Sequence, residues 1–204
     1  MLKLVHAPRS RSSGTLWLLE ETGAPYEVQY VTIRRGDGSG TLDPGNPHPH
    51  GKVPLLIDGD EIVHEQSAIA LYLADKFPQS RLGPVVGAPR RGAFLTMLAY
   101  YSGVIEPAFT SKFMNVSVPR GTAGWVGADE AMEFVNKRLA GSPYIAGDSF
   151  TAADVMYAGA FGMFMNTPLL GQAKTPQLEA YVARCVARPA HNRAMAKDSP
   201  PPAT

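Results

Sequence analysis

The stretch His48-Pro49-His50-Gly51-Lys52-Val53-Pro54-Leu55-Leu56-Ile57 has the features of a binding site for a peptide-like ligand. It follows a glycine-rich loop and ends in an apolar run that is typical of a strand. Because Pro54 donates no backbone hydrogen bond, the N–H and C=O of Val53 can pair with an extended peptide instead. An ordinary edge strand that begins with a proline explains the same residues. The neighbouring elements must decide between the two interpretations.

A second candidate is Glu65-Gln66-Ser67, at the start of a helix that the sequence predicts over residues 66–77. The first N–H groups of a helix and the positive end of its dipole point outward there, which suits a carboxylate ligand. Alternatively, Glu65 and Ser67 cap the helix. The two roles are compatible.

Three further features of the sequence give weaker evidence for a functional site. Gly36-Asp37-Gly38-Ser39-Gly40 lacks the Lys-Ser/Thr pair of a phosphate-binding loop, which favours a surface loop. His48 and His50 have no carboxylate or cysteine nearby in the sequence, so we expect no metal site. Cys185 is the single cysteine, which excludes an internal disulfide, and its apolar neighbours favour a buried thiol.

Composition narrows the class of protein. The chain has 204 residues, of which 45% are hydrophobic and 18% charged, as in a globular protein with a substantial core. A formal net charge of +1 argues against a nucleic-acid partner or an anionic membrane surface. No apolar run approaches the ~20 residues of a membrane helix, and residues 1–8 are too short for a signal peptide. We therefore expect a cytoplasmic protein.

The first part of the chain mixes strands and helices. The predicted order is strand 2–6, helix 15–22, strand 26–33, strand 53–57, strand 61–64 and helix 66–77. Ser12 or Ser13 is expected to cap the first helix. Residues 78–89 hold three prolines and two glycines and are predicted to be a linker.

Beyond the linker the sequence predicts only helices, over residues 90–115, 122–140, 152–165, 176–187 and 189–197. Residues 199–204 are expected to be disordered. Thr151 and Asp154 have the spacing of a capping box, in which Asp154 is a buried structural carboxylate.

This order of elements resembles the glutathione S-transferase family over nearly the whole chain. The motifs that carry the resemblance are Arg9-Ser10-Arg11-Ser12 before an apolar helix, Gly51-Lys52-Val53-Pro54, Glu65-Gln66-Ser67-Ala68-Ile69 and Ser149-Phe150-Thr151-Ala152-Ala153-Asp154. The bend at residues 9–13 is most similar to those of bacterial members that use a hydroxyl rather than a tyrosine.

The resemblance implies an α/β thioredoxin-like domain at residues 1–78, with the order βαβ, loop, ββα, in which Pro54 is cis. A linker at 79–89 and an all-α helical-bundle domain at 90–204, ending in the disordered proline-rich tail, follow. It also implies a cytoplasmic homodimer that functions in detoxification.

The resemblance further implies that glutathione is the co-substrate and that no metal is needed. Val53, next to Pro54, would pair with the cysteinyl backbone of glutathione. The γ-glutamyl end would be held by Glu65 and by the N–H of Gln66 or Ser67. Lys52 and His50 would lie near the glycyl carboxylate. Gln66 stands where the family usually has serine, which puts the detailed γ-glutamyl contact in question.

The bend is expected to activate the glutathione thiol. Ser10 is the main candidate, Ser12 and Ser13 are rivals, and Arg9 or Arg11 can add positive potential. The expected reaction joins the thiolate to a small apolar electrophile. For the electrophile pocket we name aromatic and methionine residues past the linker: Tyr100, Tyr101, Phe109, Phe113 and Met114. The alternatives are a glutathione-dependent hydroperoxide reductase and a non-catalytic glutathione-binding or regulatory protein of the same fold.

Overall fold

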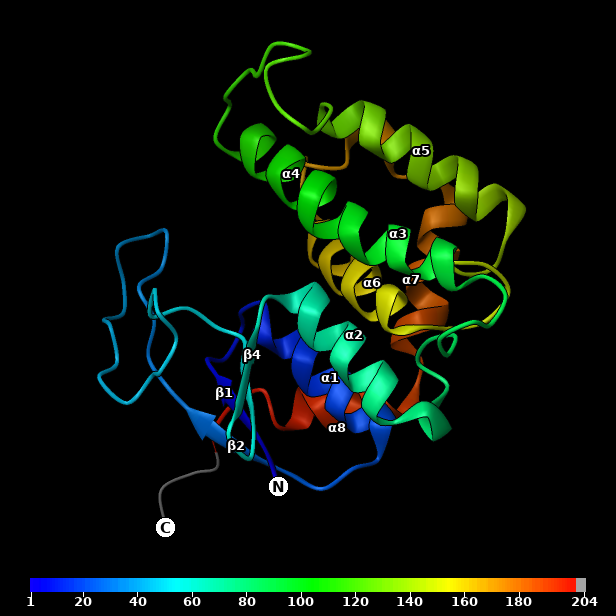
Figure 1. Cartoon of the computed structure of the whole chain (residues 1–204). Coiled ribbons are helices and arrows are strands. Elements are labelled where there is room, and N and C mark those ends of the chain that lie inside the picture. Colours follow the sequence, from blue (N-terminus) through cyan, green and yellow to red (C-terminus); the bar gives the residue numbers. More distant parts are fainter. Residues whose placement is uncertain (201–204) are drawn as a thin grey trace. The chain divides into compact units, whose positions relative to one another are not determined.

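The computed structural model describes residues 1–200, which form two compact units (Figure 1). The first unit contains Met1–Ser80 together with the described residues from Pro189 on, and the second contains Arg81–Arg188. Residues 201–204, in the tail predicted to be disordered, lie outside the described part of the chain.

A four-stranded mixed sheet forms the centre of the first unit. Its strands are β1 (Leu2–His6), β2 (Tyr26–Tyr30), β3 (Leu55–Asp58) and β4 (Glu61–His64), in the order β2-β1-β3-β4. β1 is parallel to β2 and antiparallel to β3, and β3 forms a hairpin with β4. The predicted strand–helix–strand, loop, hairpin order is therefore confirmed. The observed β2 stops at Tyr30 and β3 starts at Leu55, so both elements begin or end inside the predicted bounds.

The described part of this unit has three α-helices, α1 (Ser12–Thr22), α2 (Gln66–Lys76) and α8 (Pro189–Ala196), and a short 3₁₀ helix at Pro78–Ser80. α1 contacts β1, α2 and α8, which explains why Leu16, Trp17, Leu18 and Leu19 are all buried. The ring of His191 lies edge-on to Trp17 at 4.7 Å, and the Arg193 guanidinium donates to the Glu20 carboxylate. The predicted helical domain extended to residue 204. In the structure α8 packs instead on α1, because the buried methyl groups of Ala190 and Ala194 allow a close approach.

The second unit is helical. Its helices are α3 (Arg91–Tyr100), which continues through a π-helical turn (Tyr101–Ile105) into α4 (Glu106–Phe113), then α5 (Ala128–Gly141), α6 (Ala152–Phe164) and α7 (Pro176–Val186). Most side chains of α6 are buried, and α6 contacts both α3 and α7. A helix that is apolar on all sides is expected at the centre of such a unit.

Asp154 joins several segments within the second unit. Its carboxylate accepts hydrogen bonds from the Thr151 N–H and hydroxyl (2.8 and 2.9 Å), the Ile145 N–H (2.8 Å) and the Tyr181 hydroxyl (3.0 Å). The capping box predicted from the sequence is present. Burial raises the pKa of Asp154 and the four donors act in the opposite direction. Asp154 therefore has a structural role.

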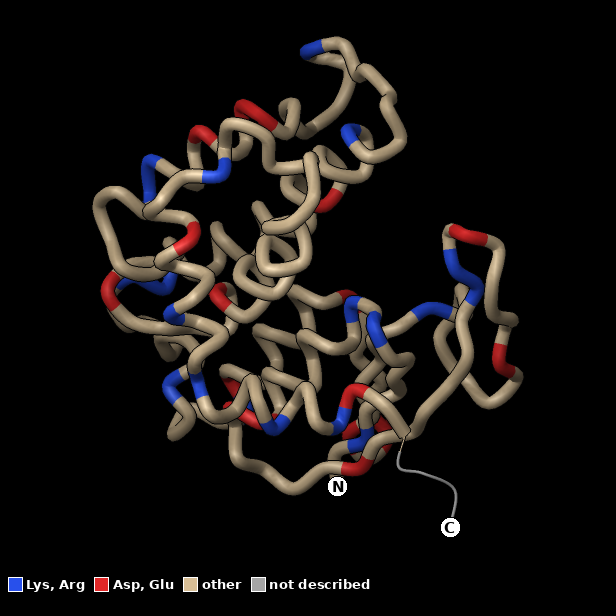
Figure 2. Tube along the Cα trace, turned by 180° about the vertical axis from the view of Figure 1, so that it is seen from behind, with Lys and Arg blue, Asp and Glu red and all other residues tan. Residues whose placement is uncertain are grey.

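The distribution of charged residues and the hydropathy of the helices agree with what the composition indicated. Basic and acidic residues are interspersed along the trace of each unit (Figure 2). Within residues 1–200, no helix is both long enough and apolar enough to cross a bilayer.

Replacing Asp154 by alanine is expected to destabilise the protein strongly. The change removes an N-terminal cap, about 1 kcal/mol, and leaves buried donors without an acceptor, about 1–3 kcal/mol. The urea midpoint of unfolding should fall accordingly. Asp148→Ala is the matched control, because it removes an exposed ion pair with Arg90 that contributes at most about 1 kcal/mol. Equal midpoint shifts in the two variants would contradict this role for Asp154.

Candidate functional site

The register of the sheet brings three predicted site segments to one edge. Val5 pairs with Leu55, and Leu55 pairs with His64. The end of β1, the start of β3 and the end of β4 therefore lie next to one another. The bend at residues 9–13, the Val53–Pro54 peptide and the start of α2 all continue from these three strand ends.

The Val53–Pro54 peptide bond is cis, as the resemblance implied. The ladder of β3 begins at Leu55, so the backbone of Val53 lies outside the sheet pairing. The Val53 side chain packs against the hydrophobic cluster of Val5, Ala7, Val31 and Leu55. This packing orients the Val53 backbone at the sheet edge.

The loop before Pro54 is held by its own side chains. Asn46 is buried; its amide donates to the Lys52 carbonyl and accepts from the His48 N–H, both at 3.0 Å. His48 is also buried, and its Nδ1 accepts from the His50 N–H at 3.1 Å. His50 and Lys52, both predicted to bind ligand, are exposed at this edge.

Glu65 occupies an unusual position at the start of α2. Its backbone has φ 70° and ψ 124°, a conformation that costs a non-glycine residue about 1–3 kcal/mol. The exposed carboxylate makes no capping hydrogen bond, so the strained conformation is not explained by a helix cap. Gln66 and Ser67 follow in the first turn and are half-buried. The Gln66 amide donates to the Arg11 carbonyl at 3.0 Å, which ties α2 to the bend.

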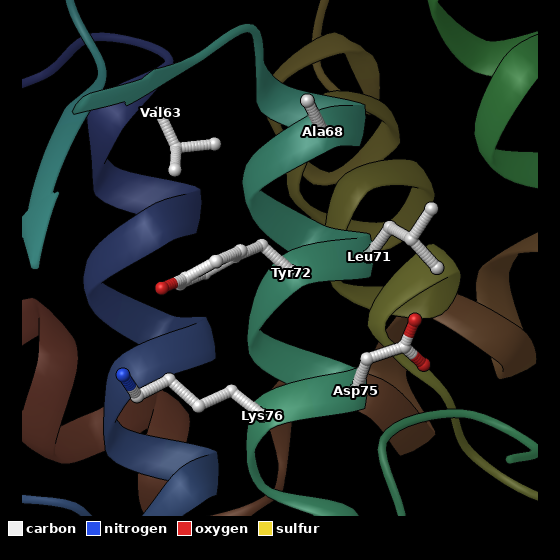
Figure 3. A pocket seen from close by; sticks show the side chains of 6 residues that line it. All are labelled: Val63, Ala68, Leu71, Tyr72, Asp75 and Lys76. Carbon is white, nitrogen blue, oxygen red and sulfur yellow. The ribbon is translucent and has the colours of Figure 1, made fainter. Parts of the chain in front are cut away.

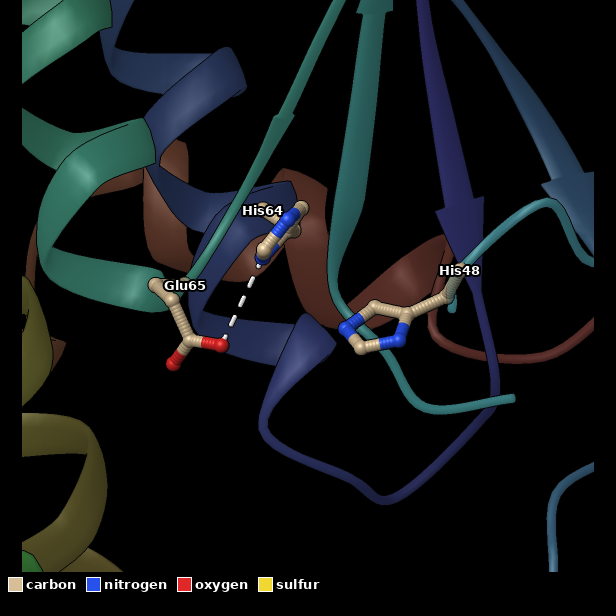
Figure 4. A group of neighbouring side chains, drawn as sticks. All are labelled: His48, His64 and Glu65. Carbon is tan, nitrogen blue, oxygen red and sulfur yellow. Dashed lines mark ion pairs between the residues drawn. The ribbon is translucent and has the colours of Figure 1, made fainter. Parts of the chain in front are cut away.

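His48, His64 and Glu65 form one group, in which one potential metal-ligand atom from each side chain lies within 4.8 Å of the others (Figure 4). His64 Nδ1 is 3.5 Å from the Glu65 carboxylate. Burial and the nearby His64 lower the pKa of His48, so the His48 ring is neutral near pH 7. Because His48 Nδ1 accepts from a backbone N–H, Nε2 carries the hydrogen and has no lone pair for a metal. The geometry therefore favours hydrogen bonding over metal binding.

The bend contains three serines with different partners. Ser10 is half-buried; its hydroxyl lies 2.7 Å from the Ala7 carbonyl and 2.8 Å from Ser12 Oγ. Ser12 is fully buried, and its Oγ lies 2.7 Å from Nδ1 of His6. The Ser13 hydroxyl donates to the carboxylate of Asp198. The expectation that Ser12 or Ser13 caps α1 is wrong, because α1 starts at Ser12 after Arg11 and has no side-chain cap.

Arginines surround this bend. Arg9 has φ 52° and its N–H donates to the Asp198 carboxylate at 3.0 Å. The Arg35 guanidinium reaches from the long loop and donates to the carbonyls of Pro8 (2.7 Å) and Arg9 (3.3 Å). Arg11 is exposed. These contacts hold the backbone of the bend in place.

Four residues at this edge were not predicted from the sequence: His6, Arg35, Asn46 and Asp198. His6 falls on the buried side of the alternation Leu2, Leu4, His6, which is the one signal that could have identified it. Asp198 is separated from the bend by most of the chain, and no local pattern indicates the contact.

Of the five residues expected to line an electrophile pocket, Tyr100 is half-buried with its ring 4.8 Å from that of Phe134, and the other four divide into two groups. Tyr101 and Phe109 are buried in the second unit, where they contact Tyr157 and Phe164. Phe113 and Met114 are 75% and 64% exposed. Tyr101 and Phe109 are therefore core residues, whereas the other two lie on the surface. Cys185 is buried, which raises the pKa of its thiol to about 12, so it is not a nucleophile near neutral pH.

A mixed βαβ–ββα unit with a cis-proline at one edge of its sheet, together with a helical unit, defines a thioredoxin-like protein with an added helical domain. Two family models match the chain: glutathione S-transferase, N-terminal domain, over residues 1–75, and glutathione S-transferase, C-terminal domain, over residues 118–184. The chain belongs to the glutathione S-transferase family, and is an enzyme of that class.

Individual relatives agree with this assignment. A glutathione transferase from Methylococcus capsulatus has 30% sequence identity and a TM-score of 0.77, with 97% of this chain and 98% of that chain covered. A sphingomonad glutathione S-transferase, solved in complex with glutathione, has 30% identity and a TM-score of 0.75, with 96% and 98% covered. A glutathione S-transferase of Hyoscyamus muticus is 28% identical, with 87% of this chain and 89% of the relative covered. For Arabidopsis glutathione S-transferase F14, at 26% identity, the match covers 76% of this chain and 66% of the relative.

Proposed function

We propose that this enzyme joins the thiolate of glutathione to a small apolar electrophile, and that the Ser10 hydroxyl stabilises the thiolate. The observation that carries the proposal is the common edge of the sheet. Three groups meet there: the bend with Ser10, the backbone of Val53 outside the sheet pairing, and the carboxylate of Glu65, which does not cap α2. A similar protein binds glutathione, as the sphingomonad complex records.

The proposed contacts follow the chemistry of the tripeptide. The Val53 backbone pairs with the cysteinyl residue as an added strand would. Glu65 accepts from the γ-glutamyl ammonium, and the first N–H groups of α2, at Gln66 and Ser67, hold the adjacent carboxylate. Lys52 and His50 lie on the side of the glycyl carboxylate. The Gln66 side chain is used by the Arg11 carbonyl, so the proposal assigns ligand binding to the Gln66 backbone only.

Ser10 is favoured among the hydroxyls because it is half-buried and its acceptor is the Ala7 carbonyl, from which rotation of the hydroxyl can turn the hydrogen toward a ligand, whereas the other two contact side chains. The Ser12 hydroxyl is buried against His6, and the Ser13 hydroxyl donates to Asp198. A hydrogen bond to a charged group contributes about 1.5–3 kcal/mol, and one pKa unit corresponds to about 1.36 kcal/mol. One donor therefore lowers the pKa of a thiol, about 8.5 when free, by about one to two units.

We also propose that the enzyme acts in detoxification in the cytoplasm, as the family resemblance implies. Detoxification in the cytoplasm suits a reaction that consumes reduced glutathione, which is abundant in that compartment.

We also propose a homodimer. Its support is a shallow surface pocket on β4 and α2, lined by Val63, Ala68, Leu71, Tyr72, Asp75 and Lys76 (Figure 3). Tyr72 and Lys76 both donate to Asp58, and the apolar part of the lining consists of Val63, Ala68 and Leu71 beside the exposed Asp75. Such a patch suits contact with another subunit.

Sedimentation equilibrium should show a dimer that Leu71→Glu converts to monomer. A dimer unaffected by the substitution places the interface elsewhere.

Ser10→Ala is expected to lower kcat with a chlorodinitrobenzene-type electrophile by about tenfold or more at neutral pH, because the thiol loses its donor and one pKa unit is a tenfold change. The pKa of bound glutathione, followed by the ultraviolet absorbance of the thiolate, should rise by about one to two units. Ser39→Ala, in an exposed turn of the long loop, is the control. Unchanged kcat and thiol pKa in Ser10→Ala would remove Ser10 from the mechanism.

Glu65→Gln should weaken glutathione binding and leave stability nearly unchanged. The substitution removes the charge that pairs with the ligand ammonium but keeps the size of an exposed side chain. Loss of a charge-assisted hydrogen bond predicts an increase in Kd of about tenfold or more, measurable by calorimetry. The exposed Glu27, on β2, provides the control Glu27→Gln. Equal affinities in both variants would contradict the proposed γ-glutamyl contact.

The same assays separate the alternative functions. Turnover of hydroperoxides without conjugation would indicate the reductase. Retention on immobilised glutathione without turnover of a broad panel of electrophiles would indicate a binding protein.

A further inference from the structure

A chain of hydrogen bonds leads from Ser10 into the interior of the first unit. Ser10 Oγ lies 2.8 Å from Ser12 Oγ, which lies 2.7 Å from Nδ1 of His6. On the far side of the ring, Nε2 of His6 is 3.4 Å from the Asp198 carbonyl and 3.5 Å from the Asp198 carboxylate. The chain thus connects the half-buried hydroxyl of the bend to a carboxylate on the C-terminal segment.

The partners determine where the hydrogens lie. Both groups that face Nε2 of His6 are acceptors, so Nε2 carries a hydrogen. In the neutral ring, Nδ1 is then an acceptor, and the Ser12 hydroxyl donates to it. Ser12 Oγ accepts in turn from the Ala7 N–H at 3.2 Å and from the Ser10 hydroxyl. The Ser10 hydroxyl has a second acceptor, the Ala7 carbonyl at 2.7 Å, and rotation about its Cβ–Oγ bond turns its hydrogen between that carbonyl and Ser12 Oγ. With the hydrogen on the side of Ser12, the hydroxyl hydrogens of Ser10 and Ser12 both point toward His6.

Resting on the proposed role of Ser10, we propose that His6 takes up the proton of the glutathione thiol through Ser10 and Ser12, and that Asp198 stabilises the protonated His6. His6, Ser12 and Asp198 do not touch the thiol. They act on it only through Ser10, so we class them as positioning residues.

The proposed step moves one proton charge over three hydrogen bonds. The thiol S–H bond breaks as its proton binds to Ser10 Oγ, the former Ser10 proton passes to Ser12 Oγ, and the former Ser12 proton passes to His6 Nδ1. Each serine ends as a neutral hydroxyl, the thiol becomes a thiolate, and His6 becomes an imidazolium. After the step, Nδ1–H donates to Ser12, Ser12 donates to Ser10, and Ser10 donates to the sulfur.

The oxygens can accept every bond in both states. Before the step Ser12 Oγ accepts from Ala7 and Ser10; afterwards it accepts from Ala7 and His6. Ser10 Oγ then accepts from the Ser12 hydroxyl and from the Ser12 N–H, which is 3.2 Å away. Neither oxygen accepts more than two hydrogen bonds, which is the number that its two lone pairs allow.

The surroundings of His6 suit a ring that is neutral at rest and charged during the reaction. His6 is fully buried, and burial lowers its pKa while Asp198 acts in the opposite direction. From β2, the Tyr30 ring lies edge-on at 5.6 Å; its pKa is raised, so it remains neutral. From α1, His6 meets the non-titrating Ser12. Asp198 is the charged group that faces His6, and it is held by the Arg9 N–H and the Ser13 hydroxyl.

Asp198→Asn provides the test, because it removes the charge and retains a side chain of the same shape. The pKa of bound glutathione, measured by thiolate absorbance on the full chain, should rise by about one unit, and kcat/KM at neutral pH should fall about tenfold. Asp148→Asn, which removes an exposed carboxylate in the second unit, is the matched control and should change neither value.

The outcomes separate this proposal from the proposed function. If Ser10→Ala raises the thiol pKa and Asp198→Asn does not, the proton transfer to His6 is wrong and the role of Ser10 stands. If Asp198→Ala raises the thiol pKa and Asp198→Asn does not, Asp198 only docks the C-terminal segment, which also overturns the proposal. If Ser10→Ala has no effect, the proposed function itself fails.

The dependence of kcat/KM on pH provides an independent measurement. With His6 as acceptor, the rate should be level across neutral pH and fall only below the lowered pKa of His6. In His6→Asn, whose amide oxygen can still accept from Ser12, no proton acceptor remains. Log kcat/KM should then rise by about one per pH unit up to the pKa of the thiol. A level profile in a folded His6→Asn variant would overturn the proposal; if that variant does not fold, the result with Asp198→Asn decides.

Discussion

The antiparallel pairing of β1 with β3 is the constraint on which the rest of the site depends. It reverses the chain direction between Val5 and Leu55, so that the end of one strand meets the beginning of the other. A parallel arrangement would place the bend and the Val53–Pro54 peptide at opposite edges. With β4 returning beside β3, Glu65 joins the same edge. The candidate site is therefore a consequence of strand direction, and side chains refine it.

Competition among hydroxyls is the second organising feature. Three serines lie within four residues, and their chemical type does not distinguish them. Their acceptors do: Ser12 donates to the ring of His6, Ser13 donates to the carboxylate of Asp198, and Ser10 faces the backbone carbonyl of Ala7. Ser10 is left as the half-buried hydroxyl at the sheet edge. A buried histidine and a distant carboxylate thereby assign roles within a short polar segment.

The two units use buried polar groups in different ways. In the second unit Asp154 is surrounded by four donors and stabilises the start of α6. In the first unit His6 has acceptors on one side and hydroxyls on the other, so it can change protonation state without losing a partner. The first arrangement resists change, whereas the second is suited to proton transfer.

Local patterns were sufficient for the elements themselves. The strand at residues 2–6, the consecutive strands at 53–57 and 61–64 and the capping box at Thr151 and Asp154 are short-range features, and the sequence predicted all of them. The order of motifs also indicated the family, and the cis bond at Pro54 was implied by that resemblance alone. The placement of α8 on α1, and the contact of Asp198 with His6 and Ser13, could not be predicted in this way. They join residues almost two hundred positions apart, and such contacts depend on packing that no local periodicity encodes. For the same reason the sequence could name Ser10, Ser12 and Ser13 as candidates, but their different partners emerged only once the chain was folded.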